Sequence, residues 1–201
     1  MGDNERTALQ ELAEIAPGPS GSLLDGLGTA PDGVPVVTPS DITSSNQVDP
    51  RTLRTLPHDE AAGLDRFRLR PGDIVVVRQG SLGRITLIGP ALAGALYNSS
   101  CARVRCHNQR VLPEYLYAYL SSSAMQEELL NRALQGTVPS LNAAILGELP
   151  VVLPPLDKQH RVVAVVSDVD ELARIHRATV DRLDVLKQAL LDDLLDGGRY
   201  A

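Results

Sequence analysis

The sequence has no tryptophan, a single phenylalanine, only two cysteines and no long apolar run. Two cysteines are too few to define a disulfide framework, which excludes a disulfide-stapled mini-protein. The longest uncharged stretches contain glycine, proline and serine, and none approaches the roughly 20 apolar residues of a membrane-spanning helix. With 201 residues, of which 43% are apolar, the composition predicts a globular chain of one domain, or one domain plus an appendage.

The amino-terminal sequence lacks the pattern of an export signal. Residues 1–6 are polar, and no apolar segment follows them. A secretory signal needs a basic start and then an apolar stretch of roughly 7 to 15 residues. We therefore expect the chain in the cytoplasm, without a membrane partner.

Acidic residues outnumber basic ones, but the charge is unevenly distributed along the chain. The net charge is −6, and residues 1–50 hold eight acidic residues and one arginine. Residues 51–110 hold ten arginines and four acidic residues. Such an asymmetry favours an anionic partner such as DNA. Ordinary solvated arginines at strand edges would explain the same segment, and charge alone does not separate the two interpretations.

The first third of the chain is rich in residues that favour turns. The apolar residues in 9–15 predict one short amphipathic element, and residues 34–37 predict a short buried strand. Residues 40–47 are polar and are expected to form an exposed loop that carries short hydrogen-bonding side chains.

The clearest local prediction in the middle of the chain is a β-hairpin. Two β-branched runs, residues 74–78 and 84–88, flank the turn sequence Gln79-Gly80-Ser81-Leu82-Gly83. Arg78 and Arg84 stand at the two ends of this turn. Further short strands are predicted at residues 95–97 and 102–106.

After residue 110 the apolar spacing changes to that of helices. Helices are predicted at residues 113–120, from Ser123 to about Leu134 with Gln126 completing a capping box, and at 142–146. A strand at residues 151–153 closes the globular part. The fold class expected is therefore α+β: a mixed, mostly antiparallel β domain with short helices over residues 1–155, followed by one long helix.

Residues 156–198 have a different pattern. No proline or glycine occurs before Gly197, so one helix of about 60 Å is predicted, which is longer than a domain of this size covers with its own core. Its apolar residues follow heptad a and d positions, with exceptions at His176, Thr179 and Asp193. A coiled-coil partner, either a second copy or another protein, is favoured over folding back onto the domain. The predicted interface residues are Val162, Val165, Val169, Leu172, Ile175, Leu183, Leu186 and Leu190.

No group of residues suggests catalysis. Cys101, Cys106 and His107 have looser spacing than a zinc knuckle and lack a second ligand pair, so structural cysteines and no metal site are expected. The segment Gly80–Gly83 lacks the Gly-Lys-Ser/Thr of a phosphate-binding loop.

The polar residues instead favour recognition of nucleic acid. Arginine suits phosphates and guanine, asparagine and glutamine suit adenine, and serine and threonine suit either role. The predicted DNA contacts are Thr38, Ser40, Thr43, Ser44, Ser45, Asn46, Arg51, Arg54, Arg78, Gln79, Ser81 and Arg84.

Five segments occur in a fixed order: residues 34–42 (VPVVTPSDI), 69–84 (LRPGDIVVVRQGSLGR), 112–120 (LPEYLYAYL), 136–142 (GTVPSLN) and 149–163 (LPVVLPPLDKQHRVV). Together they resemble the specificity subunits of type I restriction–modification systems and the target-recognition domains of related DNA methyltransferases. Two positions depart from the family pattern: Val36 replaces a frequent tryptophan, and Lys158 replaces a usual glutamate.

The resemblance implies a DNA-reading domain and a helix that joins a second copy in an antiparallel pair. A full specificity subunit has two domains and two helices, so this chain resembles half a subunit. Two copies would read a symmetric two-part site, or one copy would serve a methyltransferase alone. The family's modification subunit carries the S-adenosylmethionine site, so no cofactor is expected in this chain.

The function predicted is therefore non-catalytic. The chain would bind double-stranded DNA sequence-specifically and direct a partner DNA methyltransferase, with a restriction subunit as a further partner. A protein-interaction adaptor that uses only the helix is the main alternative, and the negative net charge of the chain favours it. A stand-alone enzyme such as a nuclease lacks support because no carboxylates cluster at metal-site spacing.

Overall fold

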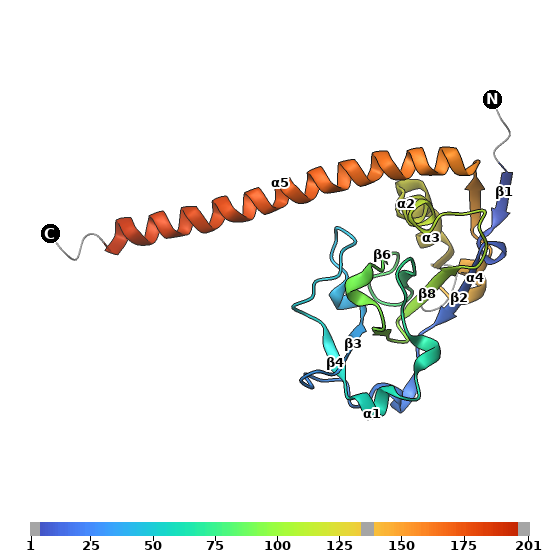
Figure 1. The fold of residues 1–201 in the computed structure, drawn as a ribbon, viewed down its shortest axis with the longest axis horizontal. Helices are drawn as coiled ribbons and strands as arrows, with labels where there is room; N and C mark the ends of the chain where they lie inside the picture. Colours follow the sequence, from blue (N-terminus) through green and yellow to red (C-terminus); the bar gives the residue numbers. More distant parts are fainter. Residues whose placement is uncertain (1–4, 134–138, 197–201) are drawn as a thin grey trace. The chain divides into compact units, whose positions relative to one another are not determined.

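The computed structural model describes residues 5–133 and 139–196 (Figure 1). The chain divides into two units, Met1–His160 and Arg161–Ala201, and each is described by itself. The first unit holds all the described strands and the short helices. The second unit is the greater part of one long helix.

The strands of the first unit form three sheets. The strands are β1 (Glu5–Ala8), β2 (Ala13–Pro17), β3 (Val34–Val37), β4 (Arg54–Leu56), β5 (Ile74–Val77), β6 (Ile85–Leu87), β7 (Leu96–Tyr97), β8 (Cys101–Cys106) and β9 (Pro150–Leu153). The sheet orders are β1-β9, β2-β8-β5-β6 and β4-β3-β7. Among the described strands, only β3 and β7 pair in parallel, so these sheets are mostly antiparallel as predicted.

The helices lie mainly in the second half of the chain. They are α1 (His58–Ala61), α2 (Pro113–Ser121), α3 (Ser123–Ala133), α4 (Ala143–Gly147) and α5 (Leu156–Asp196). Pro113 occupies the first turn of α2, where its missing N–H has no helical partner to lose. The side chain of Asn142 caps α4 by accepting from the backbone N–H of Ile145 at 2.8 Å.

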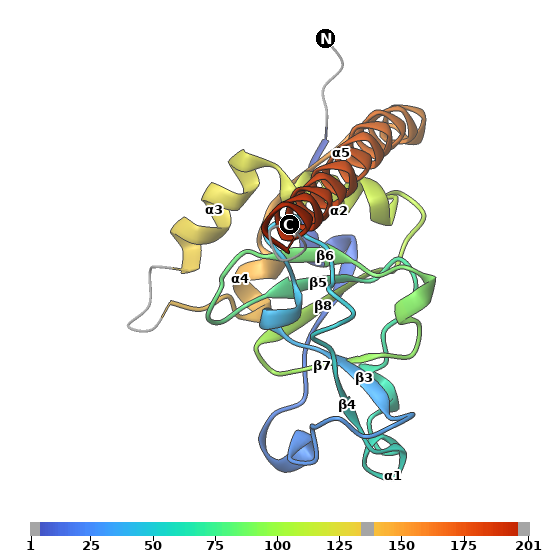
Figure 2. The ribbon, with the colours of Figure 1, turned by 90° about the vertical axis from the view of Figure 1, so that its left-hand side faces the viewer.

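One core cluster lies between the four-stranded and the three-stranded sheets. Val75 and Val77 of β5 belong to the same buried cluster as Val36 of β3 and Leu96 of β7. Figure 2 shows β3 and β4 on one side of β5 and β6, with α2 on the other. Every residue of β5 is buried, which explains why this strand is uniformly apolar and does not alternate.

Asp73 fixes the turn that starts the hairpin of β5 and β6. Its carboxylate is 1% exposed and accepts from the backbone N–H of Arg70 at 2.7 Å. The guanidinium of Arg105 donates to both of its oxygens, each at 2.7 Å. Gly72 precedes it at φ +88°, a conformation that favours glycine. The Gly-Asp pair of the family-like segment therefore has a structural role.

Three local predictions need correction or fall outside the described residues. Residues 9–15 do not form one amphipathic element: Leu9–Glu11 form a short 3-10 turn, and Ala13–Pro17 form β2, because pairing with β8 outweighs the local spacing. The amide of Gln126 donates to the carbonyl of Leu120 at 2.8 Å rather than completing a capping box. Leu134 and residues 136–138 of the 136–142 segment lie outside the described residues.

None of the described helices combines the length and the apolar character needed to cross a membrane.

Candidate nucleic-acid interface

The polar segment after β3 is a compact loop held by a buried carboxylate. Asp41 is 2% exposed, and its Oδ2 accepts from both the backbone N–H and the hydroxyl of Thr38, each at 2.7 Å. Its Oδ1 accepts from the hydroxyl of Thr52 at 2.8 Å, and its carbonyl accepts from the N–H of Asp49. One side chain thus joins the start and the end of the loop, which makes it a rigid platform.

The tip of this loop is a tight turn between Thr43 and Gln47. The Thr43 N–H donates to the Gln47 carbonyl at 2.8 Å, and the Gln47 N–H donates to the Thr43 hydroxyl at 3.2 Å. Asn46 adopts φ +60°, which asparagine tolerates better than most residues. Ser44, Ser45 and Gln47 are exposed at this tip. Their side chains therefore point to solvent from a fixed backbone.

The hairpin between β5 and β6 supplies a second tip. Gly80 and Gly83 both have φ near +80°, so the loop bends where only glycine fits without strain. A side chain at Gly83 would also meet the amide of Gln126 from α3, at 2.7 Å. Gln79 and Ser81 lie exposed at the tip. This second loop again combines a fixed backbone with exposed polar side chains.

Arg84 ties the two loops together. Its Nη1 donates to the carbonyl of Ile42 at 2.9 Å, and the N–H of Ile85 makes a longer contact, 3.5 Å, with Oδ1 of Asn46. The two tips therefore belong to one surface. That surface offers hydroxyl and amide groups, which are the groups that read base edges.

Arg78 is also bound to main-chain carbonyls. Its Nε donates to Leu141 and its Nη1 to Ser99, both at 3.1 Å. Arg78 and Arg84 are half-buried, and both hold loops in place. Whether either also contacts a phosphate stays a prediction.

The other predicted residues differ in how free their side chains are. Arg51 is exposed but donates to both oxygens of Asp49, at 2.9 and 2.7 Å, and these hydrogen bonds lower the pKa of Asp49 to about 2. Arg54 is exposed, and within the described residues its guanidinium makes no hydrogen bond or ion pair. Thr38 is only 2% exposed and its hydroxyl is bonded to Asp41, so Thr38 helps to hold the loop, and its DNA contact stays a prediction.

The remaining predicted residues, Ser40 and Thr43, carry partly satisfied hydroxyls. The Ser40 hydroxyl is 2.9 Å from that of Thr38, and the Thr43 hydroxyl donates to the Gln47 carbonyl at 3.0 Å. Gln47, which the predicted set omits, is exposed beside them. The sequence predicts Gln47 in the exposed loop of residues 40–47, and the Thr43–Gln47 bonds place it at the turn.

Much of the positive charge of residues 51–110 is used inside the fold. Arg103 is 2% exposed and donates to Glu14 at 2.8 Å and to the Arg66 carbonyl at 2.9 Å. Arg105 pairs with Asp73, and this hydrogen-bonded pair raises the pKa of Arg105. The arginine-rich segment is thus largely structural, which weakens charge as an argument for DNA.

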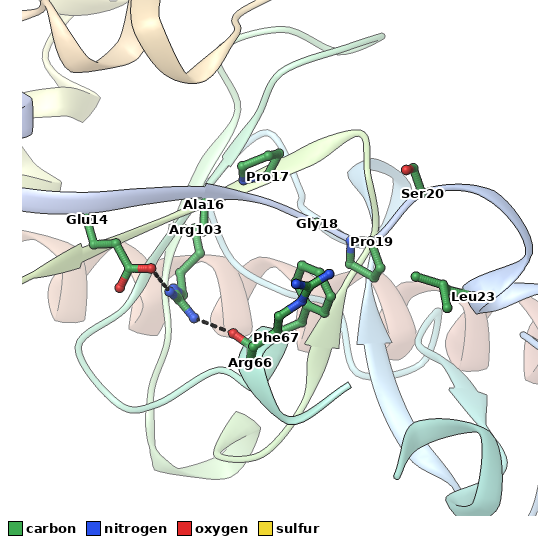
Figure 3. A pocket seen from close by; sticks show the side chains of 10 residues that line it. All are labelled: Glu14, Ala16, Pro17, Gly18, Pro19, Ser20, Leu23, Arg66, Phe67 and Arg103. Carbon is green, nitrogen blue, oxygen red and sulfur yellow. Dashed lines mark hydrogen bonds and ion pairs between the residues drawn. The ribbon is translucent and has the colours of Figure 1, made fainter. Parts of the chain in front are cut away.

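A pocket of about 420 Å³ lies beside β2, with Arg103 among its lining residues (Figure 3). The guanidinium of Arg66 sits over the ring of Phe67, 4.6 Å from its centroid, at the same pocket. Figure 3 shows Arg103 between Glu14 and the Arg66 carbonyl, so both of these hydrogen bonds join Arg103 to other groups of the protein.

Cys101 is buried and Cys106 is half-buried. Burial raises the pKa of Cys101 to about 12 and that of Cys106 to about 11, so both thiols are protonated at neutral pH. Within residues 5–133 and 139–196, no three His, Cys, Asp or Glu side chains gather as metal ligands would.

The second unit carries an exposed apolar stripe. Every predicted interface residue is exposed, from 41% at Val162 to 64% at Val165. A helix with such a stripe in water favours a partner.

The match to a protein family shows which family the chain belongs to. The family described as type I restriction modification DNA specificity domain matches residues 1–184. The chain belongs to this family. Within the type I specificity family, it is similar to the type I restriction enzyme EcoBI specificity subunit of Escherichia coli, with 26% identity over 164 residues, 80% of this chain and 34% of the relative. It is also similar to the putative MjaX specificity subunit of Methanocaldococcus jannaschii, with 23% identity over 82% of this chain and 40% of the relative.

Solved specificity subunits of type I systems share the fold. The HsdS subunit from Thermoanaerobacter tengcongensis matches with a TM-score of 0.62 and 20% identity, over 96% of this chain and 45% of that one. The type I S subunit from M. genitalium matches with a TM-score of 0.65 and 15% identity, over 94% and 45%. The chain thus spans less than half the length of these relatives.

Proposed function

We propose that the chain reads a double-stranded DNA sequence and directs a partner DNA methyltransferase to it. The observation that carries this proposal is the pair of tied loop tips. Ser44, Ser45, Gln79 and Ser81 present hydrogen-bonding groups from backbones fixed by Asp41, Arg84 and two glycines. Fixed donors and acceptors on one surface are what direct readout of a groove requires.

The proposal assigns no chemistry to the chain itself. S-adenosylmethionine would be bound by the methyltransferase, and a restriction subunit would be a further partner of the assembled complex. The exposed stripe of α5 supports pairing with a second copy, so that two tip surfaces read a two-part site.

The first test is isolation of the tagged chain from its native cells, with the co-purifying proteins identified by mass spectrometry. An adenine-type DNA methyltransferase should co-purify, and one methylated sequence motif should vanish from the genome when the chain is deleted. Recovery of unrelated proteins with an unchanged methylation pattern would contradict the proposal.

The tip surface is tested by the triple variant Ser44→Ala, Ser45→Ala and Gln79→Ala. Lost base contacts should cost about 1–3 kcal/mol of discrimination each, so methylation should spread to related sequences. Ser167→Ala with Gln188→Ala, two exposed polar positions of α5, is the matched control and should leave the motif unchanged.

An adaptor without DNA recognition is the second candidate. The internal use of Arg78, Arg84, Arg103 and Arg105 favours it, because these charges already have protein partners. Absence of salt-dependent DNA binding by the assembled complex would favour this alternative.

A further inference from the structure

The pocket beside β2 has a charged end and an apolar end. Its volume of about 420 Å³ lies in the lower part of the range of small-molecule sites in proteins. Figure 3 shows Glu14 and Arg103 at one end of the pocket and Pro19 and Leu23 at the other. The guanidinium of Arg66 lies between the two ends. Such a pocket suits a ligand with one charged group and one apolar group.

The buried side chain of Arg103 has a hydrogen-bond donor without a partner. The residue is 2% exposed, and its Nη1 and Nη2 donate to the carbonyl of Arg66 and the carboxylate of Glu14. Its Nε–H is buried and has no partner among the described residues. A buried donor without an acceptor is costly. An acceptor atom of a ligand in the pocket would satisfy it.

Arg66 supplies further donors at the exposed side of the pocket. Its guanidinium lies over the ring of Phe67, 4.6 Å from the centroid, and makes no hydrogen bond or ion pair within the described part of the chain. Stacking uses the flat face of a guanidinium, so the N–H groups in its plane stay available to donate. A carboxylate is the acceptor that fits this fork of donors best.

The charges that line the pocket favour an anion with a single negative charge. Arg103 forms an ion pair with Glu14 at 2.8 Å, so one of the two positive charges is already neutralised. Arg66 leaves the described lining with one net positive charge. A doubly charged anion would in addition be repelled by the carboxylate of Glu14.

The apolar end of the pocket is formed by a rigid segment. Pro17 and Pro19 fix their own backbone angles, and the N–H of Gly18 between them donates to the carbonyl of Cys101 at 3.1 Å. A side chain at Gly18 would clash with the carbonyl of Asn98. Leu23 is 46% exposed at this end, so an apolar ligand group that covers it would gain by leaving water.

We propose that this pocket binds a monocarboxylate that carries an apolar group. The carboxylate accepts from the N–H groups of Arg66 and from the Nε–H of Arg103, while the apolar group packs against Leu23. Such a group is the carboxyl-terminal residue of a polypeptide or a free small acid. The inference goes beyond the proposed function, because the pocket lining includes none of the residues of the loop tips.

Titration of the isotope-labelled full chain tests the site, with the arginine Nε–H signals followed by nuclear magnetic resonance. N-acetyl-leucine is the probe, and the neutral N-acetyl-leucinamide has the same shape without the charge. N-acetyl-leucine should shift the Nε–H signals of Arg66 and Arg103 saturably, with a dissociation constant of about 1 mM. The amide should bind at least about tenfold more weakly, because it lacks the charged acceptor.

Two variants test the two ends of the pocket. Arg66→Ala removes exposed donors and should weaken the binding of N-acetyl-leucine by about tenfold or more. Leu23→Ser should weaken it by several-fold, because the apolar contact is lost. Arg70→Ala removes the same charge from an exposed arginine outside the pocket lining and should leave the affinity unchanged. The Nε–H signal reports on Arg103 without a substitution in the buried ion pair.

A second acid distinguishes the two sources of the carboxylate. Isocaproate has the apolar group and the carboxylate of leucine but no peptide group. Equal affinity for the two acids would indicate a free small acid, and weaker binding of isocaproate would indicate a polypeptide terminus.

Four outcomes would overturn the proposal. They are equal binding of the neutral amide, a signal shift at Arg66 that leaves Arg103 unchanged, no saturable shift at all, and tighter binding of inorganic phosphate than of either acid. The last result would indicate a site for phosphate, such as that of a DNA backbone. None of them bears on the methylation motif, so the proposed function stands or fails separately.

Discussion

Arg84 has a structural role in this chain, apart from any contact with DNA. Its guanidinium reaches from the hairpin to the carbonyl of Ile42, and that bond joins the two loops. Arg78 does the same for Leu141 and Ser99. The charge of both side chains is retained, so a positioning role and a phosphate contact are separate questions that need separate measurements.

Two substitutions at Arg84 separate these roles. Arg84→Ala should lower the free energy of unfolding by about 1–3 kcal/mol, because a charged donor to a carbonyl is lost. Arg84→Lys keeps the charge but not the planar fork, so it should be destabilised as well. Urea unfolding measures the stability, and salt titration of DNA binding measures the phosphate contact.

The decisive comparison uses the salt slope, which is the slope of the logarithm of the DNA-binding constant against the logarithm of the salt concentration. Arg54→Ala, which removes an exposed guanidinium without hydrogen bonds among the described residues, should reduce the slope by about one without loss of stability. If Arg84 only positions the loops, both of its variants keep the parent slope. A slope that falls in Arg84→Ala and returns in Arg84→Lys would show a direct phosphate contact.

Cys101 makes the fold sensitive to alkaline pH. Burial raises the pKa of this thiol from 9.0 to about 12. Since the folded pKa lies above the unfolded one, the protonated thiol stabilises the fold fully below pH 9, and this stabilisation is lost as the pH rises toward 12. The free energy of unfolding should therefore fall above pH 9. In Cys101→Ala the fall should be shallower, and an identical pH profile would contradict the assignment.

At the scale of elements, Gln159 anchors the first turn of α5 to the globular unit. The side chain is fully buried, accepts from the N–H of Leu112 at 2.9 Å, and donates to the carbonyls of Arg110 and Pro154. A glutamine with all these bonds fixes where the helix begins. The surrounding segment, residues 149–163, is one of those that resemble the family.

Gln159→Leu should destabilise the first unit by about 2–4 kcal/mol, because it leaves buried backbone groups without partners. Amide hydrogen exchange should speed up around Leu112 while the hairpin of β5 and β6 keeps its protection. Lys158→Ala changes the exposed neighbour and should have little effect. Equal destabilisation by both variants would argue against an anchoring role for Gln159.

Elements with strong local signals could be predicted from the sequence. The hairpin, α2 and the long helix follow from β-branched runs, Pro113 and heptad spacing, and the structure contains all three. The strands β1 and β2 could not be predicted, because pairing with β9 and β8, far along the chain, decides them. The site was predicted only as a set of loop residues. The burial of Thr38 and the bonds of Arg78 depend on contacts that no local pattern encodes.

At the scale of the whole molecule, the stripe of α5 predicts the oligomeric state. Leu183→Asp with Leu186→Asp places two carboxylates in the stripe, and the chain should become monomeric by light scattering. Val185→Asp with Gln188→Asp adds the same charge to exposed positions outside the stripe, and this control should keep the mass of the parent. A variant in the stripe that retains the parent mass would contradict self-association through this face.

Under the proposed function, the inward-facing arginines have a consequence for binding to arbitrary DNA sequences. Affinity for arbitrary DNA comes from cations that displace condensed counterions, and it holds a protein on wrong sequences. Here Arg103 and Arg105 are bonded to carboxylates, and the chain as a whole is acidic. Such a reader would dwell only briefly on unrelated sequences. The time it spends on a site would then depend mostly on whether the loop tips fit.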